Sequence, residues 1–138
     1  MNERRLARYL AKVDHARDRL ARVDEWWAGA TKSLQAQLAT YHAFQEAAEA
    51  SADLAAMIVV DLGQPSRDDR NNFALAANLG VLPPALVAPL QEATGLRNRL
   101  LHEYDGVDTP TALASIQRLR PAVGAFLEEV TRWLTKRG

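Results

Sequence analysis

The sequence contains no cysteine among its 138 residues. This absence excludes disulfide bonds and thiolate metal sites, and it is typical of proteins of a reducing compartment. No apolar run approaches the roughly 18 consecutive residues that a membrane span requires. The charged segment that follows the N-terminus also lacks the apolar region of a secretory signal. We therefore expect a cytoplasmic protein that makes no membrane contact.

An excess of charge of one sign is also missing, because 17 basic side chains balance 17 acidic ones. A protein that coats nucleic acid through bulk electrostatics is therefore not expected. The charge is uneven, with seven basic and three acidic side chains in residues 1–22. This excess of basic side chains is compatible with a local basic surface, although a solvated helix face of mixed charge is the simpler interpretation.

Segments with period-two alternation, glycine-rich phosphate loops and internal repeats are absent as well. Apolar residues instead recur at the three- and four-residue spacings of amphipathic helices. This pattern predicts a single all-α domain over residues 1–138, an up-and-down antiparallel bundle of about five helices. The predicted helices are 3–28, 31–62, 66–79, 84–104 and 109–134.

Local signals set the predicted helix boundaries. Ser66 and Asp69 have the spacing of a capping box, which predicts that the third helix starts at Ser66. Thr109 is suited to the N-cap of the last helix because Pro110 follows it. Pro121 lies inside that helix and predicts a kink there.

The segment "GLRNRLLHEYDGVD", residues 95–108, carries the most distinctive polar chemistry. The imidazole of His102 can take or give a proton near neutral pH, and the guanidinium of Arg97 can bind phosphate oxygens bidentately. Tyr104 can hydrogen-bond a ligand or stack on a base. These three side chains suit metal-free RNA cleavage. From spacing alone, however, an internal salt bridge of Arg97 and ordinary packing of the other two are the more economical interpretation.

A helical wheel separates these side chains. At about 100° per residue, Tyr104 falls within about 20° of Arg97, whereas His102 lies roughly 140° away, close to Asn98. If the segment is one regular helix, a compact site needs a second copy of the helix or a distortion near Gly95. A two-fold dimer would supply the second copy.

A second polar cluster lies in the helix predicted over 31–62. His42, Glu46, Glu49 and Asp53 share one face and could be metal ligands. All four come from a single helix and no second cluster joins them, so we expect no metal ion there. We expect instead that one of the carboxylates pairs with Arg97 or orients His102, with Glu49 and Asp53 as the candidates.

The segment "LRNRLLHEYDGVD" resembles the Arg-x4-6-His-x-Tyr signature of the HEPN superfamily, and in particular the HepT-like toxins of toxin–antitoxin modules. The resemblance extends over about residues 41–134, through "GQPS" and "GVLPP" to the last helix. It implies an all-helical, homodimeric, metal-independent endoribonuclease of a type II/VII-like module. Its catalytic pair would be Arg97 and His102, with Asn98 as their neighbour, and it would need no cofactor.

The resemblance also implies RNA as the substrate and an MntA-type nucleotidyltransferase antitoxin as the partner. That partner would inactivate the toxin by AMPylation of Tyr104, because added bulk and negative charge would repel RNA phosphates. The alternative function is a non-catalytic helical subunit that binds a nucleotide or a partner in a nucleotidyltransferase complex.

Overall fold

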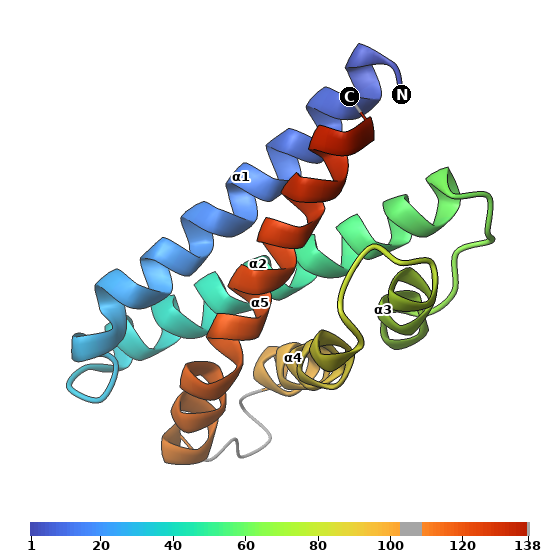
Figure 1. The fold of residues 1–138 in the computed structure, drawn as a ribbon. Helices are drawn as coiled ribbons and strands as arrows, with labels where there is room; N and C mark the ends of the chain where they lie inside the picture. Colours follow the sequence, from blue (N-terminus) through green and yellow to red (C-terminus); the bar gives the residue numbers. More distant parts are fainter. Residues whose placement is uncertain (103–108, 138) are drawn as a thin grey trace.

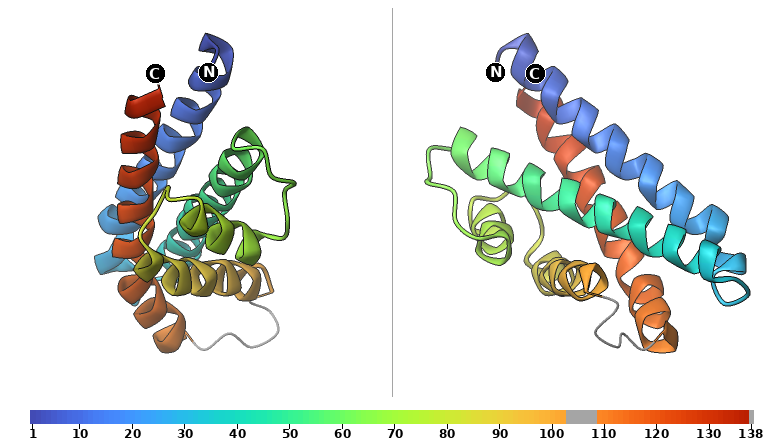
Figure 2. Two further views of the ribbon diagram at one scale, coloured as in Figure 1. Left: turned by 45° about the vertical axis from the view of Figure 1, so that its right-hand side comes forward. Right: turned by 180° about the vertical axis from the view of Figure 1, so that it is seen from behind.

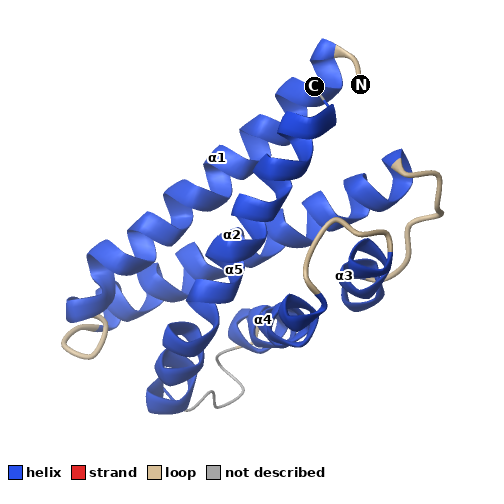
Figure 3. Ribbon diagram, in the orientation of Figure 1, coloured by secondary structure: helices blue, strands red, loops and turns tan. Residues whose placement is uncertain are grey.

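The computed structural model describes residues 1–102 and 109–137, and the regular elements within these ranges are helical (Figure 3). The prediction of an all-α bundle is confirmed. The α-helices of the described ranges are α1 (Glu3–Trp26), α2 (Leu34–Asp61), α3 (Asp69–Asn78), α4 (Val87–Leu101) and α5 (Thr109–Arg137). Two short 3-10 turns lie between them, η1 (Trp27–Gly29) and η2 (Pro84–Leu86).

Short polar side chains begin the first three helices. Asn2 accepts a hydrogen bond from the backbone of Arg5 at 2.8 Å, and Ser33 accepts one from Ala36 at 3.1 Å. Each bond satisfies an N–H group that the first helical turn leaves without a partner. Gly63 and Gly80 follow α2 and α3 with φ angles of +88° and +84°, which only glycine adopts without strain.

Helix α2 lies at the centre of the fold and packs against each of the other four α-helices. α1 and α2 run side by side in opposite directions, and α5 packs against both of them (Figures 1 and 2). Figure 1 looks nearly along the axes of α3 and α4, whereas the three long helices run across the view. α3 and α4 therefore lie crosswise against α2, on the side opposite α1 (Figures 1 and 2).

Several predicted boundaries differ from the structure. The N-cap of α3 is Asp68, which accepts from the backbone of Asn71 at 2.8 Å, so the prediction of Ser66 was wrong. The helix predicted over 84–104 begins as the turn η2 and ends at Leu101. α5 continues through Pro121 as one helix, and Figures 1 and 2 show its first turns inclined to the rest, as the predicted kink requires.

The core is a continuous cluster of buried aliphatic and aromatic side chains from every α-helix. Phe73 of α3 meets Phe126 of α5 edge-on, with 5.4 Å between the ring centroids, a favoured aromatic geometry. This contact fixes α3 to the long-helix layer. Within the described ranges, no helix is long and apolar enough to cross a membrane.

A polar network joins the N-terminal end of α1 to the C-terminal end of α2. The carboxylate of Asp61 accepts from the buried Tyr9 hydroxyl at 2.7 Å and from Nε of Arg5 at 2.9 Å. Burial acts to raise the pKa of Asp61, but the hydrogen bonds from Arg5 and Tyr9 outweigh it, and the pKa lies below its ordinary value. The ionised carboxylate therefore stabilises the packing of α1 on α2.

Candidate functional site

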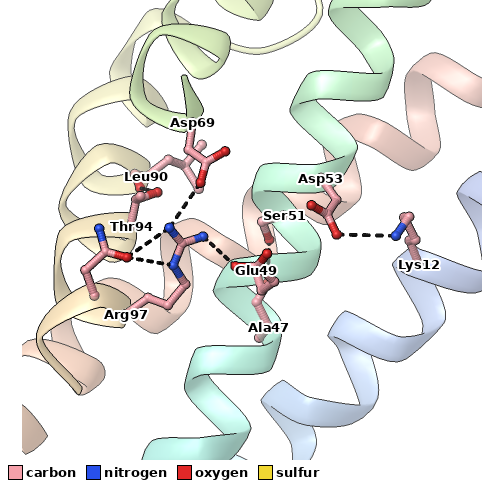
Figure 4. Close-up of polar contacts among 10 residues, drawn as sticks. Lys12, Ala47, Glu49, Ser51, Asp53, Asp69, Leu90, Thr94 and Arg97 are labelled. Atoms are coloured by element: carbon pink, nitrogen blue, oxygen red, sulfur yellow. Dashed lines mark hydrogen bonds and ion pairs between the residues drawn. The ribbon is translucent and has the colours of Figure 1, made fainter. Parts of the chain in front are cut away.

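Arg97 is the most extensively paired side chain of the predicted site. It lies in the last part of α4 with only 10% of its side-chain surface exposed. Nη1 donates to Glu49 Oε2 at 2.7 Å, and Nη2 donates to Asp69 Oδ2 at 3.0 Å (Figure 4). Nε and Nη2 both donate to Asn98 Oδ1, at 3.2 and 3.0 Å. A buried arginine requires such partners, because its charge cannot be removed by deprotonation.

Of the two carboxylates predicted to pair with Arg97 or to orient His102, the structure places Glu49 on Arg97. Asp53 lies one turn further along α2 and instead binds Nζ of Lys12 on α1 at 3.3 Å (Figure 4). Of the two candidates, Glu49 is therefore the carboxylate that pairs with Arg97. A wheel gives the face of α2 correctly, but it does not tell which residues of that face lie opposite α4 and which lie opposite α1.

His102 follows the last residue of α4 and caps it. Its backbone N–H donates to the carbonyl of Arg99 at 3.1 Å, and its φ and ψ of −115° and 39° leave the helical region. The side chain lies on the surface. The expectation of one regular helix through His102 is therefore wrong, and the helix shows no break at Gly95. The helical wheel therefore does not give the direction of the His102 side chain relative to Arg97.

The two remaining residues of the predicted site are Asn98 and Tyr104. Asn98 is exposed, and its carbonyl oxygen accepts two of the N–H groups of Arg97. This contact holds the guanidinium against its own helix. Tyr104 lies outside the described residues.

Asp69 contacts Arg97, and sequence reasoning missed this role because it treated Asp69 as part of a helix cap. Asp69 is the first helical residue of α3, and 40% of its side chain is exposed. The segment between α2 and α3 brings it over α4. That placement depends on long-range packing, and no local pattern in the sequence indicates it.

The four possible metal ligands of α2 are divided among different ion pairs. Glu46 accepts from Arg19 Nε at 2.9 Å, and its carboxylate oxygens lie 2.9 Å from His15 Nε2 and 2.5 Å from His42 Nε2. Burial acts to raise the pKa of Glu46, but the hydrogen bond and charge of Arg19, with the nearby histidines, lower it below its ordinary value. In residues 1–102 and 109–137, no group of three or more histidine and carboxylate side chains is arranged to hold a metal ion.

Comparison with known proteins gives the chain relatives over most of its length. It is 29% identical to a candidate RNase of Archaeoglobus fulgidus over 132 residues, 96% of this chain and 97% of that protein. It is 29% identical to the tRNA nuclease HepT of Aphanizomenon flos-aquae over 105 residues, 74% of this chain and 70% of the other.

Solved structures share its fold. The tri-AMPylated HEPN toxin of Shewanella oneidensis, solved in complex with the MNT antitoxin, superposes with a TM-score of 0.80. The match covers 96% of this chain and 99% of the toxin at 20% identity, a level that establishes the fold alone. The model of one family, described as ribonuclease HepT-like, matches residues 8–130. The chain therefore belongs to the ribonuclease HepT-like family.

Proposed function

We propose that this protein is the toxin of a toxin–antitoxin module and a metal-independent endoribonuclease that acts in the cytoplasm as a homodimer. The names of its relatives, an RNase and a tRNA nuclease, support the activity. The observation that carries the proposal is the end of α4, where a firmly held guanidinium at Arg97 is followed by a surface imidazole at His102.

These two groups suit cleavage by the neighbouring ribose hydroxyl of RNA. The imidazole of His102 would take the proton of the 2′-hydroxyl as its oxygen bonds to phosphorus, or give a proton to the 5′-oxygen as that oxygen leaves. The bond from phosphorus to the 5′-oxygen breaks, and a cyclic phosphate results. The positive charge of Arg97 would stabilise the negative charge that builds on the phosphate oxygens. No metal ion is needed for either step.

Local charge sets a condition on phosphodiester binding at this site. The one positive charge of Arg97 faces the two negative charges of Glu49 and Asp69, so this cluster has a net charge of −1. A phosphodiester would be repelled unless further positive charge is present. A two-fold dimer would bring another Arg97 and His102 to the same cleft. Each copy of the Arg97 cluster carries −1, so the added positive charge must come from side chains outside the cluster.

Mixed dimers test the shared cleft. Subunits carrying Arg97→Lys and subunits carrying His102→Ala are inactive alone, but together they retain one Arg97 and one His102 in the cleft. We expect partial recovery of RNA cleavage after the two variants exchange subunits. No recovery, despite mixed dimers seen by native mass spectrometry, would show that each chain forms its own site.

The central test is RNA cleavage by purified protein in the presence of a chelator. Wild type should cleave with EDTA, and His102→Ala should lower the rate by at least about 100-fold, because general acid–base catalysis contributes this much. The free energy of unfolding should change by less than about 0.5 kcal/mol, since the side chain is on the surface. His42→Ala, which removes another exposed imidazole, is the matched control and should retain activity.

We further propose that an MntA-type nucleotidyltransferase antitoxin neutralises the toxin by AMPylation of Tyr104. The chain has three tyrosines, and two of them, Tyr9 and Tyr41, are buried and hydrogen-bonded. This leaves Tyr104 as the acceptor. After co-expression with the partner, wild type should gain mass in steps of one AMP unit. Tyr104→Phe should gain none, and modification that persists in this variant would refute the assignment.

A non-catalytic binding subunit is the second candidate function. The observation that favours it is the pairing of Arg97 with two carboxylates, an arrangement that a purely structural arginine would also have. It predicts no RNA cleavage by the wild type, stable binding of the nucleotidyltransferase partner, and loss of that binding in variants of the Arg97 cluster.

A further inference from the structure

The start of α3 is fixed by the side chain of Asn72, which is buried. Its Oδ1 accepts from the backbone N–H of Arg67 at 2.8 Å, and its Nδ2 donates to the Arg67 carbonyl at 2.9 Å. The hydroxyl of Ser66 accepts a third bond from Nδ2 at 3.3 Å. One amide group therefore satisfies the polar backbone just before α3 and holds the first turn of this helix in place.

Asp69 is the residue that this arrangement delivers to Arg97. Asp68 caps the helix, so Asp69 occupies the first helical position, where a negative side chain is favoured by the helix dipole. Its Oδ2 lies 3.0 Å from Arg97 Nη2. Figure 4 shows Asp69 and Glu49 approaching the guanidinium from different helices.

The donors of Arg97 are almost fully used. A guanidinium has five N–H groups, one on Nε and two on each Nη. Asn98 takes the Nε hydrogen and one on Nη2, and Asp69 takes the other hydrogen on Nη2. Glu49 takes one hydrogen on Nη1, and among residues 1–102 and 109–137 no acceptor takes the second Nη1 hydrogen. Asp69 and Asn98 thus define the orientation of the guanidinium plane. The second Nη1 hydrogen lies on the side of the guanidinium that Glu49 binds.

We propose that Asp69 is a positioning residue for the RNA cleavage proposed above, on which this inference rests. Its carboxylate holds Nη2 of Arg97, so that the remaining Nη1 hydrogen points where a phosphate oxygen binds. Asp69 acts on the reaction only through Arg97. A charged partner is needed because an ionised acceptor binds a guanidinium about twice as strongly as a neutral one.

Asp69→Asn keeps the size of the side chain and removes its charge, and Asp69→Glu keeps the charge. In RNA cleavage assays we expect Asp69→Asn to lower kcat by about 10- to 100-fold, as small misplacements of a catalytic group do, with KM nearly unchanged. Asp69→Glu should restore a large part of kcat. Asp24→Asn is the matched control, because Asp24 also binds an arginine, Arg120, with contacts of 3.0 and 2.8 Å.

A second readout does not depend on cleavage. The Nε–H group of Arg97 gives a signal in NMR spectra that can be assigned by its loss in Arg97→Lys. In Asp69→Asn this signal should shift and its hydrogen should exchange with solvent several-fold faster, whereas in Asp24→Asn it should not change. Thermal unfolding of each variant separates these effects from a loss of folded protein.

The outcomes are distinct. If Asp69→Asn resembles Asp24→Asn in both kcat and the Arg97 signal, Asp69 does not position Arg97 and the inference is overturned. If the signal changes but kcat does not, Asp69 holds Arg97 without serving the reaction, which also overturns it. If the wild type cleaves no RNA, the proposed function fails and the catalytic part of the inference fails with it, while the NMR signal still decides whether Asp69 holds the guanidinium.

Discussion

Replacement of Arg97 by lysine should destabilise the protein far more than the loss of an ordinary surface ion pair. Arg97 connects three helices, because it lies on α4 and binds Glu49 of α2 and Asp69 of α3. It donates four hydrogen bonds in all. Lysine keeps the charge, but a single ammonium group cannot reach acceptors on opposite sides of a planar fork.

The magnitude follows from the bonds lost and from the exposure of their acceptors. Lysine would lose at least two of the four bonds, each with a net contribution of about 1 kcal/mol, and more where the acceptor is charged. Glu49 and Asp69 are 59% and 40% exposed, so water recovers part of the loss. We therefore expect the free energy of unfolding to fall by about 2 kcal/mol, and Tm to fall by roughly 6–8 °C for a chain of this length.

Chemical denaturation with urea measures this change. Arg118→Lys is the control, because Arg118 pairs with Glu92 at 2.8 Å and both side chains are more than half exposed. Exposed pairs of this kind contribute at most about 1 kcal/mol, and many contribute nothing measurable. Equal changes in the free energy of unfolding for Arg97→Lys and Arg118→Lys would refute the reasoning, since they would show that Arg97 does not hold the three helices together.

Two further predictions concern stability. Because the pKa of Asp61 is lowered in the folded state, its contribution is present above the unfolded value of about 4 and is lost as pH falls through the folded pKa. Urea denaturation at about pH 6 and about pH 3 should therefore show a smaller acid loss of stability in Asp61→Asn than in wild type, and an equal loss would contradict this assignment. Gly80→Ala should cost about 1–2 kcal/mol, because its φ of +84° is strained for alanine although no atom lies within 4 Å of the added Cβ. Gly124→Ala is the counterpart inside α5, where the added Cβ meets only the end of the Arg120 side chain, and calorimetry should show no loss of Tm beyond about 2 °C.

Local periodicity was sufficient to predict the helices, because apolar spacing records which face of each segment is buried. It was less reliable at their ends. Ser66 and Asp68 are both good caps, and in the structure Asp68 caps the helix while Asn72 binds the backbone of Arg67 just before it. The same limit explains His102, which the wheel treated as helical although α4 ends one residue earlier.

The candidate site was predictable only in part. The motif drew attention to Arg97, and the general rule that buried arginines are paired led to Glu49 on the neighbouring helix. Asp69 could not be predicted, because its contact with Arg97 depends on how α3 crosses α4, which neither segment encodes by itself. The pairing of Asp53 with Lys12 could not be predicted for the same reason, since the relative rotation of α1 and α2 decides it.

The central position of α2 has a consequence for motion. Fourteen of its 28 residues are buried, many of them alanines that allow neighbouring backbones to approach closely. The amide hydrogens in the middle of α2 should therefore exchange with deuterium only when the whole protein opens, whereas those of the ten-residue α3 can exchange through smaller openings. Glu49 therefore lies on the helix that we expect to exchange most slowly, and Asp69 lies on α3, the helix that we expect to open first.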